Sequence, residues 1–388
     1  MKRKLIPLMA LSLFSVLATS CGGSKVGEKD IFAISYNLSD PNMSGLWKVG
    51  LEDASVKHGY NKISLADARN DDGEAVKMVE AAGTQNYGGY LVNVVDQSNG
   101  RSYLNKLKDT GKPVVFFNRE LAKSDGSIDL ETMKSYEKAY YVGIESAEGG
   151  RYQGALAGEY VNKTGFQTLD RNKDGKLGVI VVRGEKGHAD AEARTQFSPA
   201  YLERTITGGN TNAALKADSG KYVVDESKGA WNKVEIVEIV DGTDTSGTTW
   251  EPTTAASEVG RVLNDATKGG KVDLVLSNND GMALGILTNE AFKRSGVPIW
   301  GVDALSDALT EIKKENTQFK GTIQNDGKAQ AEVCVQAVKN LSGGKAVSDG
   351  MTVVSTKEEW EANDKAIWND TANKALRVHH AKITKANA

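Results

Sequence analysis

Polar side chains that donate and accept hydrogen bonds recur along this chain where short apolar runs end. They are carboxylates, carboxamides, one imidazole and one guanidinium: Asp40, Asn93, His188, Asp190, Arg194, Asn279, Asp303 and Asn325. Carboxylates accept several hydrogen bonds, carboxamides both donate and accept, and arginine donates in a planar fork. Such a set suits a neutral ligand rich in hydroxyl groups, as a sugar is. The aspartates outnumber Arg194, and this excess of negative charge disfavours phosphorylated or carboxylate ligands.

Each of these residues also has a purely structural explanation. Asp and Asn that follow a strand commonly cap the next helix, and capping explains any one of them taken alone. His188, Asp190 and Arg194 are harder to explain as caps, because their spacing makes them face one way where a loop enters a helix. Trp250, after a Gly/Thr-rich stretch, either presents an aromatic face to a sugar ring or belongs to the core.

A second motif has the ligand order of a calcium loop. Residues 170–176 carry oxygen side chains at loop positions 1, 3 and 5 and a carbonyl at position 7. The ligands would be Asp170, Asn172, Asp174 and the backbone of Lys176. Position 12 is Val181 instead of Glu, so a remote carboxylate must complete the site. The alternative is an ordinary polar turn.

Short apolar runs alternate with longer amphipathic segments, which indicates parallel α/β sheets. The expected strands are 31–36, 89–95, 113–118, 140–143, 177–184, 234–240, 274–278 and 298–302. The expected helices are 43–58, 73–85, 102–110, 147–163 and 280–295. The length of this pattern favours two doubly wound domains. The carboxyl ends of parallel strands meet at a crevice, which would bring the polar residues together.

The first 20 residues have the layout of a secretory signal peptide, with Lys and Arg before an apolar run from 5 to 18. Residues 21–30 are expected to be a lipid-modified Cys21 followed by a flexible tether. The alternative is ordinary cleavage that leaves Cys21 as a free thiol. No other stretch approaches the ~18 apolar residues that span a bilayer. We therefore expect an exported protein, periplasmic or on the cell surface, attached to a membrane by its lipid alone.

Composition excludes several classes of function. The 388 residues include 48 basic and 51 acidic side chains, a net charge of −3, so no nucleic-acid partner is expected. Two cysteines and four histidines leave no disulfide framework and no cysteine-based zinc cluster. Cys334 is expected in the core, and His379 and His380 have no evident partner for metal binding. The polar stretches expected to be surface insertions are 208–230, 242–249 and 355–370.

An ordered set of motifs resembles the galactose/glucose-binding periplasmic protein family, the substrate-binding proteins of bacterial sugar ABC transporters. The motifs are 116–120, 139–143, 170–175, 184–195, 278–280 and 301–305, and the likeness spans about 31–340 and 373–378. It implies a type I periplasmic-binding-protein fold, with two doubly wound parallel-sheet α/β lobes joined by a three-segment hinge. The lobes would comprise 28–144 with 325–378 and 145–324 with 379–388, with crossings near 143–144, 324–325 and 377–378.

The resemblance also implies site residues. Sugar contacts fall on Asp40, Asn93, His188, Asp190, Arg194, Asn279, Asp303 and Asn325, with Trp250 stacking on one ring face. A structural calcium ion falls on Asp170, Asn172, Asp174 and the Lys176 carbonyl, with Asp273 as the remote carboxylate. The family's second aromatic aligns with Asn42, so the other ring face is open or covered by another residue such as Trp47 or Tyr36. In the calcium loop Gly178 replaces an amide side chain, and Asp273 is shorter than the family's Glu.

By resemblance, a neutral monosaccharide, D-glucose or D-galactose, binds between the lobes and closes the hinge. The closed monomer would be recognised by an ABC-type sugar permease in the inner membrane and by a chemoreceptor. Pentoses, nucleosides and glycosides are the alternative ligands. A glycoside-acting enzyme is disfavoured, because Asp190 and Glu192 are two residues apart on a helix and do not share a face. A macromolecular partner would predict binding that survives the loss of Asp190 and Arg194.

Overall fold

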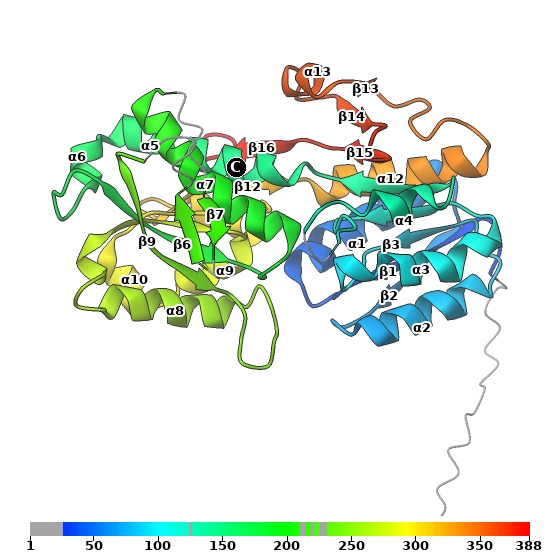
Figure 1. Cartoon of the computed structure of the whole chain (residues 1–388), viewed down its shortest axis with the longest axis horizontal. Helices are drawn as coiled ribbons and strands as arrows, with labels where there is room; N and C mark the ends of the chain where they lie inside the picture. The colour runs from blue at the N-terminus through cyan, green and yellow to red at the C-terminus, as the bar shows by residue number, and fades with distance from the viewer. Residues whose placement is uncertain (1–25, 124–125, 210–214, 219–220, 225–230) are drawn as a thin grey trace, which may run out of the picture.

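The chain folds into two α/β lobes that lie side by side (Figure 1). The computed structural model describes residues 26–123, 126–209, 215–218, 221–224 and 231–388. The expected signal peptide, residues 1–20, and Cys21 lie outside these residues. Within the described ranges, no helix is both long enough and apolar enough to cross a membrane.

The first lobe contains an eight-stranded sheet of order β13-β14-β15-β5-β4-β3-β1-β2. Its strands are β1 (Asp30–Ser35), β2 (Lys62–Asp67), β3 (Gly89–Val92), β4 (Val114–Phe117), β5 (Ala139–Gly143), β13 (Val353–Val354), β14 (Ile367–Asp370) and β15 (Ala375–Arg377). Apolar side chains of α1 (Lys48–His58) and α12 (Gly327–Ser342) cover one face. The other face is covered by α2 (Asp72–Gly83), α3 (Gly100–Leu107) and α4 (Leu130–Lys134). Strands β1 to β5 pair in parallel, so their carboxyl ends share one edge.

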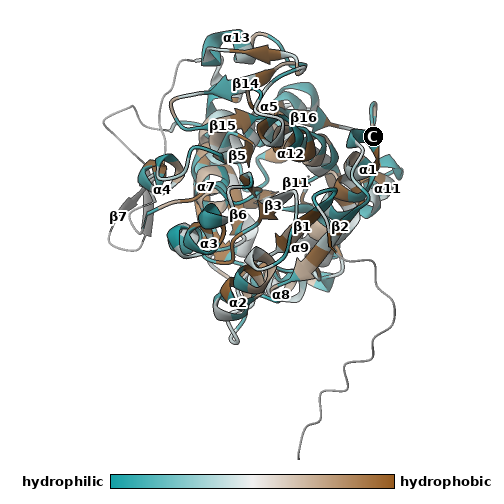
Figure 2. Cartoon of the chain, turned by 90° about the vertical axis from the view of Figure 1, so that its right-hand side faces the viewer, coloured by the Kyte–Doolittle hydropathy of each residue, from teal (hydrophilic) through white to brown (hydrophobic). Residues whose placement is uncertain are grey.

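The second lobe contains a six-stranded sheet of order β16-β12-β11-β10-β6-β9. Its strands are β6 (Leu177–Arg183), β9 (Val234–Asp241), β10 (Val272–Ser277), β11 (Ile299–Val302), β12 (Phe319–Asn325) and β16 (His380–Ile383). One face packs on α5 (Ser146–Thr164) and α7 (Ala189–Thr207). The other packs on α8 (Pro252–Asn264), α9 (Asp280–Ile286), α10 (Glu290–Ser295) and α11 (Ser306–Lys313). Figure 2 shows the resulting pattern, with hydrophobic strands inside and hydrophilic helix faces outside.

The chain passes between the two sheets three times. The crossings follow β5, follow β12, and join β15 to β16. The predicted fold class, two doubly wound lobes joined by three segments, is therefore confirmed. All expected strands are present, whereas the half-buried edge strand β2 and the strands β13, β14 and β15 were not predicted.

The single helix expected over 280–295 is wrong. Helix α9 ends at Ile286, and a new helix, α10, begins at Glu290. Asn289 separates them, because its side-chain oxygen accepts hydrogen bonds from two backbone N–H groups of the first turn of α10. An N-cap of this kind starts a helix more favourably than it continues one.

The polar stretches have different fates. Stretch 355–370 is exposed along most of its length, as expected of a surface insertion, but it also contains α13 (Lys357–Glu361), β14 and the fully buried Trp360. Residues 242–249 do form a surface loop, organised by Asp244. Stretch 208–230 lies partly outside the described residues, and its described part pairs β7 (Leu215–Asp218) with β8 (Lys221–Val224). Cys334 is buried in the first lobe, as predicted.

Candidate functional site

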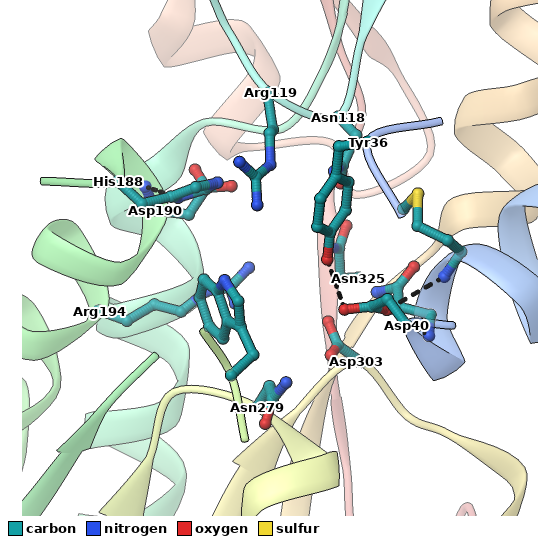
Figure 3. A pocket seen from close by; sticks show the side chains of 13 residues that line it. Tyr36, Asp40, Asn118, Arg119, His188, Asp190, Arg194, Asn279, Asp303 and Asn325 are labelled. Carbon is teal, nitrogen blue, oxygen red and sulfur yellow. Dashed lines mark hydrogen bonds between the residues drawn. The ribbon is translucent and has the colours of Figure 1, made fainter. Parts of the chain in front are cut away.

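A pocket lies between the two lobes (Figure 3). The first lobe contributes Tyr36, Asp40, Asn42, Met43, Asn118 and Arg119. The second lobe contributes His188, Asp190, Arg194, Trp250, Asn279 and Asp303, and Asn325 lies at the end of β12. All the predicted sugar contacts except Asn93 therefore line one pocket.

The start of α7 supplies three of these side chains. The Nδ1 atom of His188, the N-cap, accepts a hydrogen bond from the backbone N–H of Asp190 at 3.2 Å. The neutral ring therefore carries its hydrogen on Nε2, which is able to donate to a ligand. Burial, reinforced by Arg119, lowers the pKa of His188 to about 4. Burial alone would raise the pKa of Asp190, but His188 and Arg194 lower it overall, so Asp190 is a charged acceptor at neutral pH.

Asp40 and Asn279 combine helix capping with a place in the pocket. One carboxylate oxygen of Asp40 accepts the backbone N–H of Asn42 at 2.7 Å, at the start of the turn Met43–Trp47. Its other oxygen accepts the hydroxyl of Tyr36 at 2.5 Å. Asn279 caps α9 through its side-chain oxygen. The structural explanation, helix capping, thus holds for Asp40 and Asn279. It does not rule out a role in binding, because the capping contacts orient both side chains toward the pocket.

Asp303 forms part of the pocket wall beside β11. It is 4% exposed, and its backbone has a φ of 119°, which is rare for a residue other than glycine. Burial raises the pKa of Asp303 to about 7, Arg194 opposes the rise and Asp40 adds to it. Beneath it, the fully buried Asp280 accepts the backbone N–H of Leu305 at 2.9 Å. This contact fixes the loop that presents Asp303.

Trp250 packs against the backbone of Gly184, and its indole N–H donates to the carboxylate of Glu185. Its φ of 61° lies in the left-handed region, where a bulky side chain is strained. A Cβ on Gly184 would lie 2.0 Å from the indole, so only glycine lets the ring pack there. The indole Nε1 donates to Glu185 at 3.1 Å, and the ring meets His188 edge-on with centroids 5.5 Å apart. The indole is therefore fixed in orientation, as a stacking platform requires.

Arg119 is a pocket residue to which the sequence analysis assigned no role. Its guanidinium lies 3.8 Å from the centre of the Tyr36 ring and donates to the carbonyl of Val95 at 2.7 Å. A second nitrogen pairs with Glu185 of the other lobe at 3.0 Å. The signals in the sequence were its position directly after the expected strand 113–118 and its place in the motif 116–120.

The structure shows which residues lie where the galactose/glucose-binding family has its second stacking aromatic. Asn42 lines the pocket at the aligned position. Trp47 is 1% exposed in the core of the first lobe, so the suggestion that it covers the ligand is wrong. Tyr36 does line the pocket. Asn93 lies behind the lining, fully buried, with its amide nitrogen 3.2 Å from the sulfur of Met43.

Several buried polar atoms at this pocket have no hydrogen-bond partner among the described residues. They are Asn42 Oδ1, Arg119 Nε and Arg194 Nε. Leaving such a group unpaired costs about 1–3 kcal/mol. A ligand with several hydroxyl groups supplies both the donors and the acceptors that these atoms lack.

The loop 170–176 brings together part of the predicted calcium ligands. One carboxylate oxygen of Asp170 is buried without a partner, which fits a cation. Both oxygens of Asp273 accept backbone N–H groups, from Arg171 at 3.0 Å and from Gly178 at 2.8 Å. Within the described residues no group of three or more His, Cys, Asp or Glu is arranged to hold a metal. The calcium site therefore stays a prediction.

The two carboxylates considered for glycoside chemistry are separated. Asp190 lines the pocket, whereas Glu192 accepts the backbone N–H of Gly187 at 2.7 Å and pairs with Arg183. A glycosidase needs both carboxyl groups at the bond that breaks. Asp190 and Glu192 therefore do not form such a pair.

The sequence matches known proteins along most of its length. The model of a family described as periplasmic binding protein domain matches residues 31–346. The D-galactose/methyl-galactoside binding periplasmic protein MglB of Haemophilus influenzae is 31% identical over 357 residues, which cover 91% of this chain and 92% of that protein. The ribose import binding protein RbsB of Bacillus subtilis is 24% identical over 361 residues, covering 89% and 95%.

Solved structures share the fold. An ABC transporter solute-binding protein of Actinobacillus succinogenes with bound D-allose gives a TM-score of 0.64 at 15% identity, covering 92% of this chain and 98% of that one. The Caulobacter myo-inositol binding protein gives 0.61 at 19% identity, covering 94% and 96%. Together with the sequence matches, these findings show that the chain belongs to the family of periplasmic binding proteins.

Proposed function

We propose that this protein binds a neutral monosaccharide between its lobes, with D-galactose or D-glucose as the preferred ligand. The observation that carries the proposal is a single pocket that combines charged acceptors, a neutral imidazole donor, a guanidinium and an oriented indole. Sugar hydroxyls would donate to Asp40 and Asp190 and accept from Arg194 and His188. The 31% identity to a galactose-binding protein supports galactose.

Hinge closure would follow from the position of the pocket. Because each lobe supplies half of the lining, a sugar that contacts both halves binds the closed arrangement better than an open one. The sugar would shift the hinge equilibrium by that difference in affinity. The closed protein would then deliver the sugar to an ABC-type permease and would also be the form that a chemoreceptor recognises.

A pentose is the second candidate ligand. Asn42 replaces an aromatic of the galactose/glucose-binding family, so one wall of the pocket is more polar than in that family. A ribose-binding protein is also among the relatives, at 24% identity. An aldopentose offers one hydroxymethyl group less to the pocket, so the two ligands are distinguished by direct titration.

We also propose that the chain is exported and anchored by a lipid on Cys21. The apolar run 5–18 and the Gly-Gly-Ser that follows Cys21 support this assignment. In cell fractions, the wild-type protein should sediment with membranes, and Cys21→Ser should release it. An equal distribution of the two proteins would contradict lipid attachment.

The binding proposal is tested by isothermal titration with D-galactose, D-glucose and D-ribose. A hexose should bind with a dissociation constant of about 1 μM or lower, or roughly −8 kcal/mol. Asp190→Ala should weaken binding at least about 100-fold, because the partners of a buried charge are left unpaired. Asp53→Ala, at an exposed position on α1, is the control and should bind like wild type. Folded wild-type protein that gives no heat with any of the three sugars would contradict the proposal.

A further inference from the structure

Glu185 is outside the pocket lining, yet it contacts side chains from both lobes. It follows β6 in the second lobe, and its side chain is 25% exposed. One carboxylate oxygen, Oε2, accepts the indole N–H of Trp250 at 3.1 Å and the hydroxyl of Thr249 at 3.3 Å. The same oxygen accepts a guanidinium N–H of Arg119, which belongs to the first lobe, at 3.0 Å. Glu185 is therefore a junction between the aromatic wall of the pocket and the opposite lobe.

Each partner of this ion pair is already ordered within its own lobe. Arg119 is 3% exposed, lies over the Tyr36 ring and donates to the Val95 carbonyl. Glu185 is oriented by its contacts with the second lobe. Little side-chain freedom is lost when two preordered groups meet, so most of their attraction remains available to hold the lobes together. Burial alone would raise the pKa of Glu185, but Arg119 lowers it overall, so the carboxylate is charged.

We propose that Glu185 is a positioning residue that fastens Arg119 of the first lobe to Trp250 of the second and thereby slows release of the bound sugar. This inference rests on the proposed sugar-binding function. A neighbouring hydrogen bond also joins the lobes, because the backbone N–H of Ala189 donates to Gln97 of the first lobe at 3.3 Å. Both contacts break when the lobes separate, so their loss should act on dissociation more than on association.

The test compares sugar dissociation rates of wild type and Glu185 variants by stopped-flow fluorescence with D-galactose and D-glucose. Glu185→Gln retains an oxygen acceptor for the indole but removes the charge that pairs with Arg119. It should speed dissociation about tenfold and change association less than about twofold. Glu185→Ala should speed dissociation further, because Trp250 also loses its acceptor. Glu238→Gln is the control, since Glu238 pairs only with Arg261 and Lys268 of its own lobe in the described contacts.

A double-mutant cycle separates the bridge from a local effect on Trp250. In an Arg119→Gln background, Glu185→Gln should change dissociation less than about twofold, because its partner is already gone. An unchanged rate in the single Glu185→Gln variant, or the same acceleration in both backgrounds, would overturn the inference while leaving sugar binding intact.

If wild type binds neither sugar, the proposed sugar-binding function is wrong, and the Glu185–Arg119 bridge is then tested without a ligand by small-angle scattering. At low salt, Glu185→Gln should then have a larger radius of gyration than wild type, and 1 M salt should reduce the difference because it partly screens the ion pair. Equal radii at low salt would overturn the bridge.

Discussion

Asp303 is the pocket side chain whose charge changes nearest to neutral pH. Burial, opposed by Arg194 and reinforced by Asp40, raises its pKa to about 7. His188, with a pKa of about 4, stays neutral over the same range. The pKa of Asp280, the carboxyl beneath the loop, is raised well above its ordinary value by burial and by Asp303. The pH dependence of ligand binding near neutrality should therefore come mainly from Asp303.

Hexose affinity should fall as the pH decreases below 7. An ionised carboxylate accepts hydroxyl groups on both oxygens and binds them more strongly than a protonated carboxyl does, so bound sugar favours the charged form of Asp303. The loss should grow as pH falls below the pKa, to at most about tenfold per pH unit. Titration calorimetry from pH 5 to 8 measures it, with Asp303→Asn as the comparison. A variant with the same pH profile as wild type would contradict the assignment to Asp303.

The limits of prediction at this scale are visible in particular side chains. Asp190 and Asn279 were identifiable because strand ends converge in a parallel sheet whatever the details of packing. Arg119 was not predicted to line the pocket, where its guanidinium lies over the Tyr36 ring. Asn93 was predicted as a contact, but it lies behind the lining against Met43. Trp47 has the chemistry of a stacking residue, but its helix presents it to the core.

At the scale of elements, the first turn of α5 meets the segment that joins β15 to β16. Glu148 of α5 is 1% exposed and accepts ring N–H groups of His379 at 2.7 Å and His380 at 2.9 Å. The other ring nitrogen of His379 faces the carbonyl of Trp360 at 2.9 Å. The rings of His379 and Trp360 stack with their centroids 3.8 Å apart. Because both ring nitrogens of His379 face acceptors, the imidazolium form satisfies them best.

This cluster should make stability depend on pH. Burial would lower the pKa of His379, but Glu148 raises it overall, so the contribution of His379 is complete below its ordinary pKa and is lost as pH rises through the raised value. Burial alone would raise the pKa of Glu148, but hydrogen bonds from His379 and His380 lower it to about 2. The contribution of Glu148 to stability is therefore lost as pH falls from about 4.5 toward 2.

Glu148→Gln should lower the free energy of unfolding by about 3–5 kcal/mol, because it breaks a buried ion pair. It should also flatten the decline in stability above pH 7. Urea unfolding followed by circular dichroism at pH 6 and 8 measures both effects. Glu159→Gln, on the exposed side of the same helix, is the control. A loss no larger than that of the control would show that the cluster is not a charged pair.

The calcium loop is a prediction about one element, the connection into β6. Calcium should raise the melting temperature of the protein, and chelation should lower it, because a ligand that binds only the folded state stabilises it. Asp170→Asn should remove the calcium-dependent part of the melting temperature. Identical melting curves with calcium and with chelator would show that residues 170–176 are a polar turn.

At the scale of the whole molecule, the protein consists of two lobes, each built on one main sheet. Three crossings join the lobes, and the pocket lies between them. The alternation of strands and helices predicted two doubly wound domains, because parallel strands require crossover helices. The three crossings were predicted only from the family resemblance. The segment 355–370 was not predictable in this way, since its polar composition conceals Trp360, which is buried against the hinge. Helix α13 also brings Lys357 within 3.4 Å of Glu145 at the start of α5, so this segment spans the hinge.

The most direct measurement is a crystal structure of the protein grown with D-galactose. The account predicts one pyranose between the lobes, with hydroxyls bonded to Asp190 and Arg194, one ring face on Trp250, and Arg119 paired with Glu185. Crystals that contain galactose outside this pocket, or an empty pocket at a galactose concentration that saturates binding in solution, would contradict it.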